Sequence, residues 1–168
     1  MAKRISETLT YPGTTVTQIA DMFADPEFRK AVAAYQRAVK SEATVARSDS
    51  GMDIHFQYSH GTEHVPGFAR KLVGDEIPIV QDEKWTTNGD GLDAAVTIVI
   101  PGKPGDMSGT AKLRQVGDDV VETVELTVKV GIPLVGGKVE DLIAGLLTKA
   151  LRAENKVGLK WLAGEWRA

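Results

Sequence analysis

The sequence contains no cysteine among its 168 residues. Disulfide bonds and thiolate chemistry are therefore excluded, and a chain without cysteine is compatible with the cytoplasm, where we expect this protein to reside. No stretch of eighteen apolar residues is present, so we expect no membrane-spanning segment and no stable membrane insertion. The first eight residues carry a basic pair with no apolar run behind it, so the sequence predicts no signal peptide.

Neither sign of charge dominates the chain. Its 20 Lys and Arg against 23 Asp and Glu give a net charge of −3, which provides no electrostatic reason to expect nucleic acid or an anionic membrane as the partner. The hydrophobic fraction of 42% and the charged fraction of 26% are typical of a soluble globular domain. With no internal repeat and no linker-like stretch, we expect one domain over residues 1–168.

The familiar catalytic signatures are absent too. The sequence has no Gly-x-Ser-x-Gly nucleophile elbow, no phosphate-binding loop and no dinucleotide fingerprint. Its three histidines are His55, His60 and His64, and a spacing of five puts the first two on opposite faces of a strand, which is poor geometry for a metal. We therefore predict no metal and no cofactor, and we assign no catalytic residue.

The most regular pattern that is present lies at the carboxyl end, from Gly137 to Trp166. Apolar residues recur there at steps of three and four, which predicts one long amphipathic helix. Glu140 and Asp141 suit the positive end of its dipole, and Gly136–Gly137 separates it from the strand before. The apolar stripe comprises Val139, Leu142, Ile143, Leu146, Leu147, Ala150, Leu151, Val157, Trp161 and Leu162.

Upstream of this helix the hydrophobic period is two, which is typical of strands with one buried face. Ser50-Gly51, Asn88-Gly89-Asp90-Gly91 and Gly117-Asp118 are turn signals between such runs and predict hairpins. The predicted strands are residues 4–11, 43–49, 52–60, 77–87, 92–100, 107–116 and 120–130.

Two short helices are predicted between the first two strands. Thr15 with Gln18 resembles a capping box, and Asp25-Pro26-Glu27 combines an N-cap, a proline at the first helical position and an acid in the first turn. On the second helix we expect a buried side of Phe28, Ala31, Val32, Tyr35, Ala38 and Val39, and an exposed side of Arg29, Lys30, Arg37 and Lys40.

Together these elements predict an α+β protein. Because each strand has only one apolar face, the sheet is covered on one side, and only the terminal helix is long enough to cover it. A twisted sheet of this size must curl. We expect a helix-grip fold: a curved antiparallel sheet of about six or seven strands wrapped around a long C-terminal helix, with two short helices after the first strand.

This succession resembles the START-like superfamily, which includes the birch-pollen allergen, lipid-transfer domains and polyketide cyclases, and the resemblance runs from Arg4 to Trp166. A narrower likeness, to an uncharacterised actinobacterial branch of unknown function, is carried by Pro66-Gly-Phe-Ala-Arg-Lys-Leu-Val-Gly74, Gln81-Asp-Glu-Lys-Trp85 and Gly136-Gly-Lys-Val-Glu-Asp-Leu-Ile. The resemblance implies an apolar small molecule between helix and sheet. It implies no catalytic residue, because no catalytic motif of the superfamily is present.

We therefore hypothesise a binding site for a hydrophobic small molecule such as a fatty acid, a lipid or a polyketide-like compound. Glu83 and Glu154 fall on apolar faces, where burial would raise their pKa values and where they would orient a polar group of the ligand. Glu7 and Glu122 share the inward parity. Alternatively, bulges, strand ends or rotation of the helix keep these carboxylates at the rim. The predicted ligand-binding residues are Phe56, Tyr58, Phe68, Leu72, Glu83, Trp85, Val96, Ile98, Leu126, Leu142, Leu146, Glu154 and Trp161.

The open volume of such a site is limited by stability. A drug-sized pocket occupies about 300–1,000 Å³, and leaving the lower volume empty would cost about 7 kcal/mol at about 24 cal/mol per Å³. The small inward residues Ala94, Gly109 and Ala111 favour some open volume, the alternative being complete packing by side chains. Residues 65–74 form either a flap, with Phe68 and Leu72 closing over the cavity, or a fixed connection.

Two other functions stay open. An enzyme of cyclase, dehydratase or hydrolase type would use Glu83 or Glu154 as acid or base. A protein-interaction module would expose an apolar patch on the outer face of the sheet, against which the polar alternation of Thr123, Glu125, Thr127 and Lys129 argues. We favour non-enzymatic binding.

Overall fold

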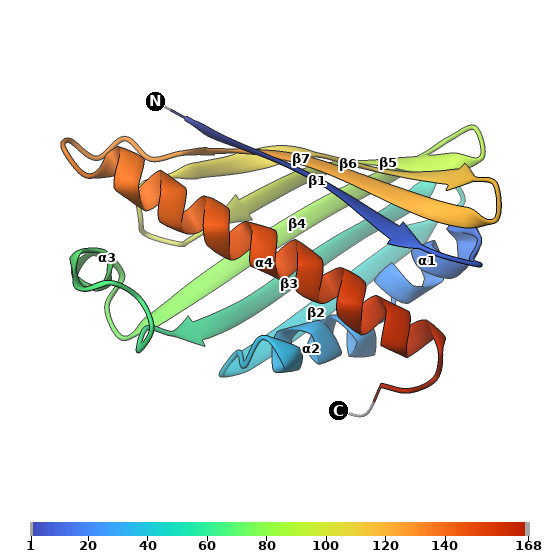
Figure 1. Cartoon of the computed structure of the whole chain (residues 1–168), viewed down its shortest axis with the longest axis horizontal. Helices are drawn as coiled ribbons and strands as arrows, with labels where there is room; N and C mark the ends of the chain where they lie inside the picture. The colour runs from blue at the N-terminus through green and yellow to red at the C-terminus, as the bar shows by residue number, and fades with distance from the viewer. Residues whose placement is uncertain (1, 167–168) are drawn as a thin grey trace.

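The computed structural model describes residues 2–166 and contains, within them, a seven-stranded antiparallel sheet and four helices (Figure 1). The predicted helix-grip architecture is confirmed. In chain order the elements are β1 (Lys3–Tyr11), α1 (Val16–Phe23), α2 (Pro26–Tyr35), β2 (Lys40–Ser48), β3 (Gly51–Gly61), α3 (Gly67–Val73), β4 (Glu76–Asn88), β5 (Gly91–Val99), β6 (Asp106–Val116), β7 (Asp119–Lys129) and α4 (Gly136–Leu162).

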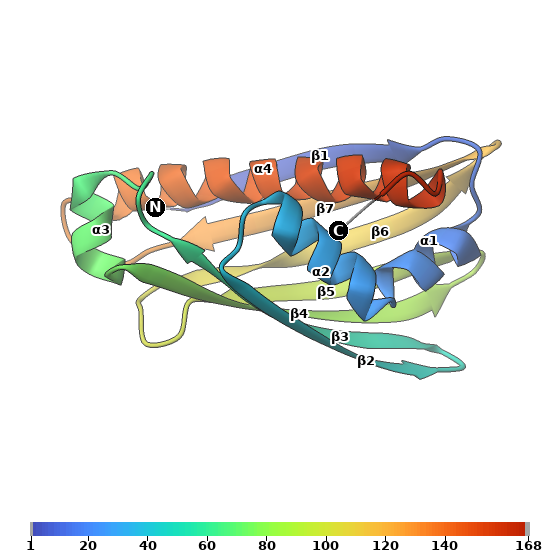
Figure 2. The same ribbon diagram turned by 90° about the horizontal axis from the view of Figure 1, so that it is seen from below.

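The strand order is β1-β7-β6-β5-β4-β3-β2. After β1 the chain crosses through α1 and α2 to the opposite edge of the sheet, and then returns strand by strand until β7 pairs with β1. The sheet curves, and α4 lies along its concave side (Figure 1). Figure 2 shows α1 and α2 on that same side of the sheet. Three helices therefore enclose one face.

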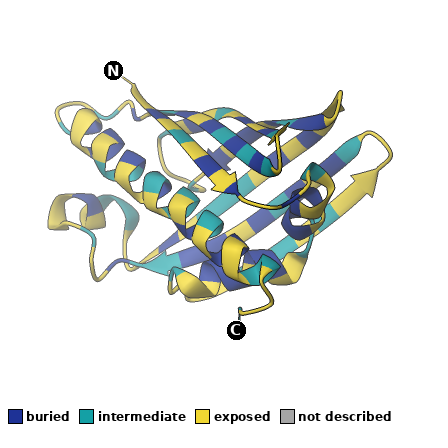
Figure 3. Cartoon of the chain, turned by 45° about the vertical axis from the view of Figure 1, so that its right-hand side comes forward, coloured by how far each residue is buried: buried dark blue, intermediate teal, exposed yellow. Residues whose placement is uncertain are grey.

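The strands have one buried and one exposed face, as their period of two predicts. Along β7, Val120, Glu122, Val124, Leu126 and Val128 are buried, and the residues between them are exposed or half-buried. Figure 3 shows a similar alternation on other strands, while the edge strand β2 alternates between half-buried and exposed residues over most of its length. Any polar side chain at an inward position is therefore removed from water and must find its partners in the interior.

The predicted starts of α1 and α2 are confirmed. The backbone N–H of Gln18 donates to the Thr15 hydroxyl (3.2 Å) and the Thr15 N–H donates to Oε1 of Gln18 (2.8 Å), which completes a capping box. Asp25 caps α2 by accepting from the N–H of Glu27 (2.9 Å), with proline in the first turn. These caps fix where α2 begins and so which of its faces meets the sheet.

The predicted faces of α2 need correction. Arg29, predicted to be exposed, is only 1% exposed, whereas Tyr35 is 39% exposed and Val39, beyond the end of the helix, is 61% exposed. The physical reason is position: Arg29 precedes Val32 and Ala33 by three and four residues and so shares their buried face.

The stripe on α4 also differs from the prediction. Leu146 is 45% exposed, while its neighbour Leu147 is buried, because one residue along a helix turns the side chain by about 100°. Glu140 does not stand at an exposed helix end. Its buried carboxylate accepts a hydrogen bond from the backbone N–H of Val130 (2.8 Å) and so ties α4 to the end of β7.

Two glycines mark close approaches of the backbone. A Cβ atom at Gly158 of α4 would lie 2.9 Å from the Tyr11 ring and 3.0 Å from Cε of Met22, so the absence of a side chain lets α4 rest on β1 and α1. A Cβ at Gly109 of β6 would lie 1.8 Å from the carbonyl oxygen of Glu125 on β7. The contact at Gly158 sets the distance between α4 and the sheet that the interior must fill, whereas the contact at Gly109 lies within the sheet, between β6 and β7.

The segment between β3 and β4 folds as α3 at one end of the molecule (Figure 1). Arg70 donates hydrogen bonds to the backbone carbonyl oxygens of Thr62, Glu63 and Val65, which tie the helix to the loop before it. Phe68 is 39% exposed. None of the helices within residues 2–166 is long and apolar enough to cross a membrane.

Candidate functional site

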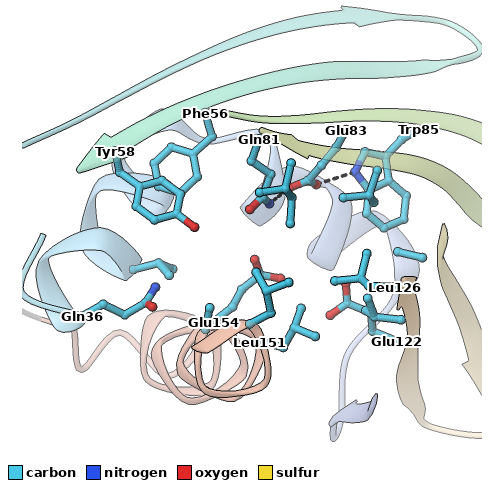
Figure 4. A pocket seen from close by; sticks show the side chains of 17 residues that line it. Gln36, Phe56, Tyr58, Gln81, Glu83, Trp85, Glu122, Leu126, Leu151 and Glu154 are labelled. Carbon is cyan, nitrogen blue, oxygen red and sulfur yellow. Dashed lines mark hydrogen bonds between the residues drawn. The ribbon is translucent and has the colours of Figure 1, made fainter. Parts of the chain in front are cut away.

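A cavity lies between the inner face of the sheet and helices α2 and α4 (Figure 4). The space between its lining side chains is about 590 Å³ when the part that opens to solvent is included, but only about 50 Å³ admits the centre of a water-sized sphere. That smaller volume holds a few water molecules, at about 10–15 Å³ each. The cavity is lined by Val32, Gln36, Phe56, Tyr58, Gln81, Glu83, Trp85, Val96, Ile98, Ala111, Glu122, Val124, Leu126, Leu147, Ala150, Leu151 and Glu154.

Behind one wall of the cavity, Arg29 holds two carboxylates together. Its Nη1 donates to Oε2 of Glu83 (3.0 Å) and to Oε2 of Glu154 (3.2 Å). Its Nη2 donates to Oε1 of Glu83 (3.1 Å), and its Nε donates to the carbonyl oxygen of Phe23 (3.1 Å). The guanidinium therefore makes a two-pronged ion pair with β4 and a second pair with α4.

Glu83 is the acceptor on which the β4 side of the cluster converges. It is buried, and besides Arg29 it accepts hydrogen bonds from Nε2 of Gln81 (2.6 Å) and Nε1 of Trp85 (2.8 Å). Gln81, Glu83 and Trp85 are two residues apart on one strand, so all three point to the inner face, as Figure 4 shows. This prediction of shared parity is confirmed.

The environment keeps Arg29 positively charged. Burial lowers the pKa of its guanidinium, but the nearby carboxylates of Glu83 and Glu154 outweigh that effect, and the net pKa is raised. Its Cζ also lies 5.2 Å from the centre of the Phe23 ring and 6.0 Å from that of Phe28, within the range of cation–π attraction.

Glu154 reaches the cavity from α4, with only 12% of its side chain exposed. Burial raises the pKa of its carboxyl, the positive charge of Arg29 lowers it and the charge of Glu83 raises it, with a net value of about 7. A carboxyl with that pKa exchanges its proton near neutral pH, which is the property required of an acid–base group.

Glu122 is the third carboxyl in the cavity, and it comes from β7. It is 3% exposed, and its Oε1 has no hydrogen-bond partner among residues 2–166. Burial raises its pKa well above the ordinary value for glutamate, the negative charges of Glu154 and Glu83 add to the rise, and Arg29 opposes it. Burial next to an apolar wall therefore favours the protonated form of this carboxyl.

Two tyrosines complete the set of titratable groups around the cluster. Burial raises the pKa of Tyr11 on β1 and of Tyr58 on β3, and the neighbouring glutamates raise both further. Both hydroxyls stay protonated at neutral pH, and Figure 4 shows the hydroxyl of Tyr58 directed into the cavity. The cavity thus combines apolar walls with protonated donors and carboxylate acceptors.

The structure brings together eight of the thirteen predicted ligand-binding residues. Phe56, Tyr58, Glu83, Trp85, Val96, Ile98, Leu126 and Glu154 line the cavity. The other five lie elsewhere: Phe68 and Leu72 on α3, Leu142 and the exposed Leu146 on the first half of α4, and Trp161, whose ring packs edge-on against Phe28 at 5.7 Å. Whether any of the thirteen binds a ligand stays a prediction.

Sequence reasoning missed Arg29, which organises the polar cluster. The available signal was its place three and four residues before Val32 and Ala33 on an otherwise apolar face. Glu7, which shares the inward parity of β1, lies outside the cavity and accepts from Arg152 on α4 (3.1 Å). Among residues 2–166 no group of three or more His, Asp or Glu side chains is placed to hold a metal ion.

Comparison with known proteins places the chain in a family. Residues 6–162 match the family described as protein of unknown function (DUF2505). The chain belongs to this family. An uncharacterized protein of Mycobacterium tuberculosis (strain ATCC 25618 / H37Rv) is 26% identical to the DUF2505 chain over 104 residues, which are 60% of this chain and 60% of that protein.

Solved structures agree on the fold. Human STARD10 superimposes on the DUF2505 chain with a TM-score of 0.63 and 14% identity, covering 96% of this chain and 65% of that one. The Zhui aromatase/cyclase from Streptomyces sp. R1128 has a TM-score of 0.62 and 9% identity, covering 100% and 98%. The predicted START-like fold is confirmed.

Proposed function

We propose that the protein binds a hydrophobic small molecule between the sheet and α4. The observation that carries this proposal is the unpartnered carboxyl oxygen of Glu122, buried beside an apolar wall and directed at a cavity. Leaving a buried polar atom without a partner costs about 1–3 kcal/mol. A ligand that supplies the missing partner recovers that cost when it binds.

The walls provide the rest of the affinity. The apolar lining residues come from five strands and two helices, and burying apolar ligand surface against them contributes about 25 cal/mol per Å². Because about 50 Å³ admits a water-sized sphere, a ligand the size of a fatty acid, a lipid or a polyketide requires an outward shift of α2 or α4. The START-like fold of the chain supports binding at this place between sheet and helix.

A matched pair of alanine substitutions tests this. Ala111 lines the cavity from β6, whereas Ala95 is exposed on the outer face of β5. Ala111→Leu fills the open volume, so we expect the affinity for the neutral apolar probe N-phenyl-1-naphthylamine, measured by its fluorescence, to fall about tenfold or more. Ala95→Leu is expected to bind like the unmodified protein. Equal behaviour of the two variants, or no uptake by the unmodified protein, contradicts the proposal.

One observation favours a second candidate, an enzyme of cyclase, dehydratase or hydrolase type. Glu154, with a pKa of about 7, is poised to give and take a proton inside an apolar chamber. Titration of the glutamate side chains by NMR tests this function. A measured pKa near the ordinary value for glutamate, about 4.3, removes the basis for Glu154 as acid or base.

The third function, a protein-interaction module, has less support. Among the large apolar side chains on the strands of residues 2–166, only Val99 and Val116 are exposed, and they stand near opposite ends of the sheet. They do not form a continuous patch of the kind that marks a protein interface.

A further inference from the structure

The charges around the cavity are strongly one-sided. Glu83, Glu122 and Glu154 line it, and among residues 2–166 no Lys, Arg or His side chain does so. The titratable and charged groups that face the cluster are Tyr11 from β1, Arg29 from α2, Tyr58 from β3, Glu83 from β4, Glu122 from β7 and Glu154 from α4. Three carboxyl groups therefore share one cation.

That one cation is not available to a ligand. Arg29 is 1% exposed, and it lies behind Glu83 and Glu154, to which both of its Nη atoms already donate. Its Nε is bound to the carbonyl oxygen of Phe23. An anionic head group entering the cavity thus finds no free positive partner to offset the cost of burying its own charge.

We propose, resting on the proposed function, that the ligand is an amphipathic amine whose ammonium group lies between Glu122 and Glu154. An ammonium carries three donors and no acceptor, which matches the unpartnered Oε1 of Glu122 and the carboxylate of Glu154 that shares only one oxygen with Arg29. The apolar body of the amine then lies on the walls formed by Phe56, Val96 and Leu126.

Proton balance follows from this arrangement. The raised pKa values of Glu122 and Glu154 favour the protonated forms of these carboxyls in the free protein. An ammonium favours their ionised forms, so a carboxyl that is protonated in the free protein releases its proton to the solvent when it pairs with the ammonium, and one that is already ionised releases none. Affinity for the amine therefore rises with pH through the neutral range, up to the pKa of the amine itself.

Three probes of equal chain length separate the ligand classes: octylammonium, 1-octanol and octanoate, each competed against N-phenyl-1-naphthylamine. Near neutral pH we expect the affinity for octylammonium to be about ten times that for octanoate or higher, with the affinity for 1-octanol between the two. Calorimetry in buffers of different ionisation enthalpy is expected to show proton release with octylammonium, and tighter binding at about pH 8 than at about pH 6.

Matched variants locate the effect. Glu122→Gln keeps the shape of the protonated acid, but its amide cannot ionise when an ammonium binds. The affinity for octylammonium is therefore expected to fall about tenfold, while the affinity for 1-octanol changes by less than about twofold. Glu154→Gln is the second variant, with the same expectation. Glu125→Gln, on the exposed face of the same strand as Glu122, is the control and leaves all three affinities unchanged.

The outcomes separate the two proposals. If octanoate or 1-octanol binds as tightly as octylammonium, the proposal that the ligand is an amine is wrong, while the proposal that the protein binds a hydrophobic molecule stands. If Glu122→Gln and Glu154→Gln weaken all three probes equally, charge recognition is likewise overturned. If none of the probes, including N-phenyl-1-naphthylamine, binds the unmodified protein, the proposed function fails together with the inference.

Discussion

The inner and outer sides of the sheet both carry carboxyl groups, but the pKa values of these groups shift in opposite directions on the two sides. On the outer side, Asp93 has a lowered pKa because Asn88 and Arg114 donate hydrogen bonds to its carboxylate. On the inner side, burial raises the pKa values of Glu122 on β7 and of Glu154, which faces the sheet from α4. Removal from water, which on a strand depends on the face that a residue occupies, thus decides in which direction the pKa of a carboxyl shifts.

The largest test of this contrast is removal of the buried cation. Arg29→Met leaves Glu83 buried and without its ion pair, so we expect a loss of about 3–5 kcal/mol in the free energy of unfolding, measured by urea denaturation. The matched control is Arg47→Met, which breaks the exposed pair with Asp21 and should cost less than about 1 kcal/mol. Adding Glu83→Gln to Arg29→Met is expected to restore part of the loss. Similar costs for the two single variants would contradict the contrast.

The second test is the dependence of stability on pH. The folded pKa of about 7 for Glu154 lies above the unfolded value of about 4.5, and the pKa of Glu122 is raised as well. The folded state therefore binds more protons, and stability falls as pH rises, by at most about 1.4 kcal/mol per pH unit for each group. His60, whose pKa burial lowers, acts oppositely but only below its unfolded value of about 6.5.

Between about pH 6.5 and pH 8 the two glutamates therefore dominate, and we expect a loss of about 1–2 kcal/mol across that window. The double variant Glu122→Gln/Glu154→Gln should flatten the curve and be more stable than the unmodified protein at the upper end. Glu125→Gln should keep the original slope. A stability that stays constant or rises over this window in the unmodified protein is the contrary result.

The sequence predicted the fold well because its signals are local. Period-two alternation, Gly-containing turns and the caps at Thr15 and Asp25 each act within a few residues, and the structure confirms them. The inward parity of Glu83 and Glu122 was readable for the same reason.

The features that the sequence did not predict depend on how the helices pack against the sheet. A charged residue on a short helix is usually exposed, so Arg29 was placed in solvent, although the path of α2 over the sheet buries it. Leu146 and Leu147 both fit a spacing of three and four, and only the rotation of α4 against β1 and β7 decides which one is buried. The open volume likewise depends on close approaches such as that at Gly158, which no local pattern encodes.

A smaller effect is expected from one hydrogen bond on the inner face. Trp85→Phe keeps the aromatic packing near Phe23, whose ring centre lies 5.8 Å away, but removes the N–H that donates to Glu83. We expect a loss of about 1–2 kcal/mol in the free energy of unfolding, because the carboxylate keeps its bonds from Arg29 and Gln81. The control for the loss of indole area is Trp161→Phe, because the Trp161 ring packs on Phe28 and lies outside the cavity lining. An equal or larger loss in that control would assign the effect to packing.

The smallest expected effect tests whether an inward position on a strand is enough to make an ion pair costly to break, or whether the pair must also be buried. Glu7 has the inward parity of β1 but lies on the edge strand, where Arg152 of α4, 68% exposed in its side chain, donates to it. If removal from water rather than parity alone determines the cost, Arg152→Met should lower the free energy of unfolding by less than about 1 kcal/mol, and added salt should shrink that difference further because an exposed pair is screened. Urea denaturation at low and high salt measures both. A loss as large as that of Arg29→Met, unchanged by salt, would mean that every inward carboxylate of this sheet behaves as a buried one, and the distinction between the cavity and its edge would no longer hold.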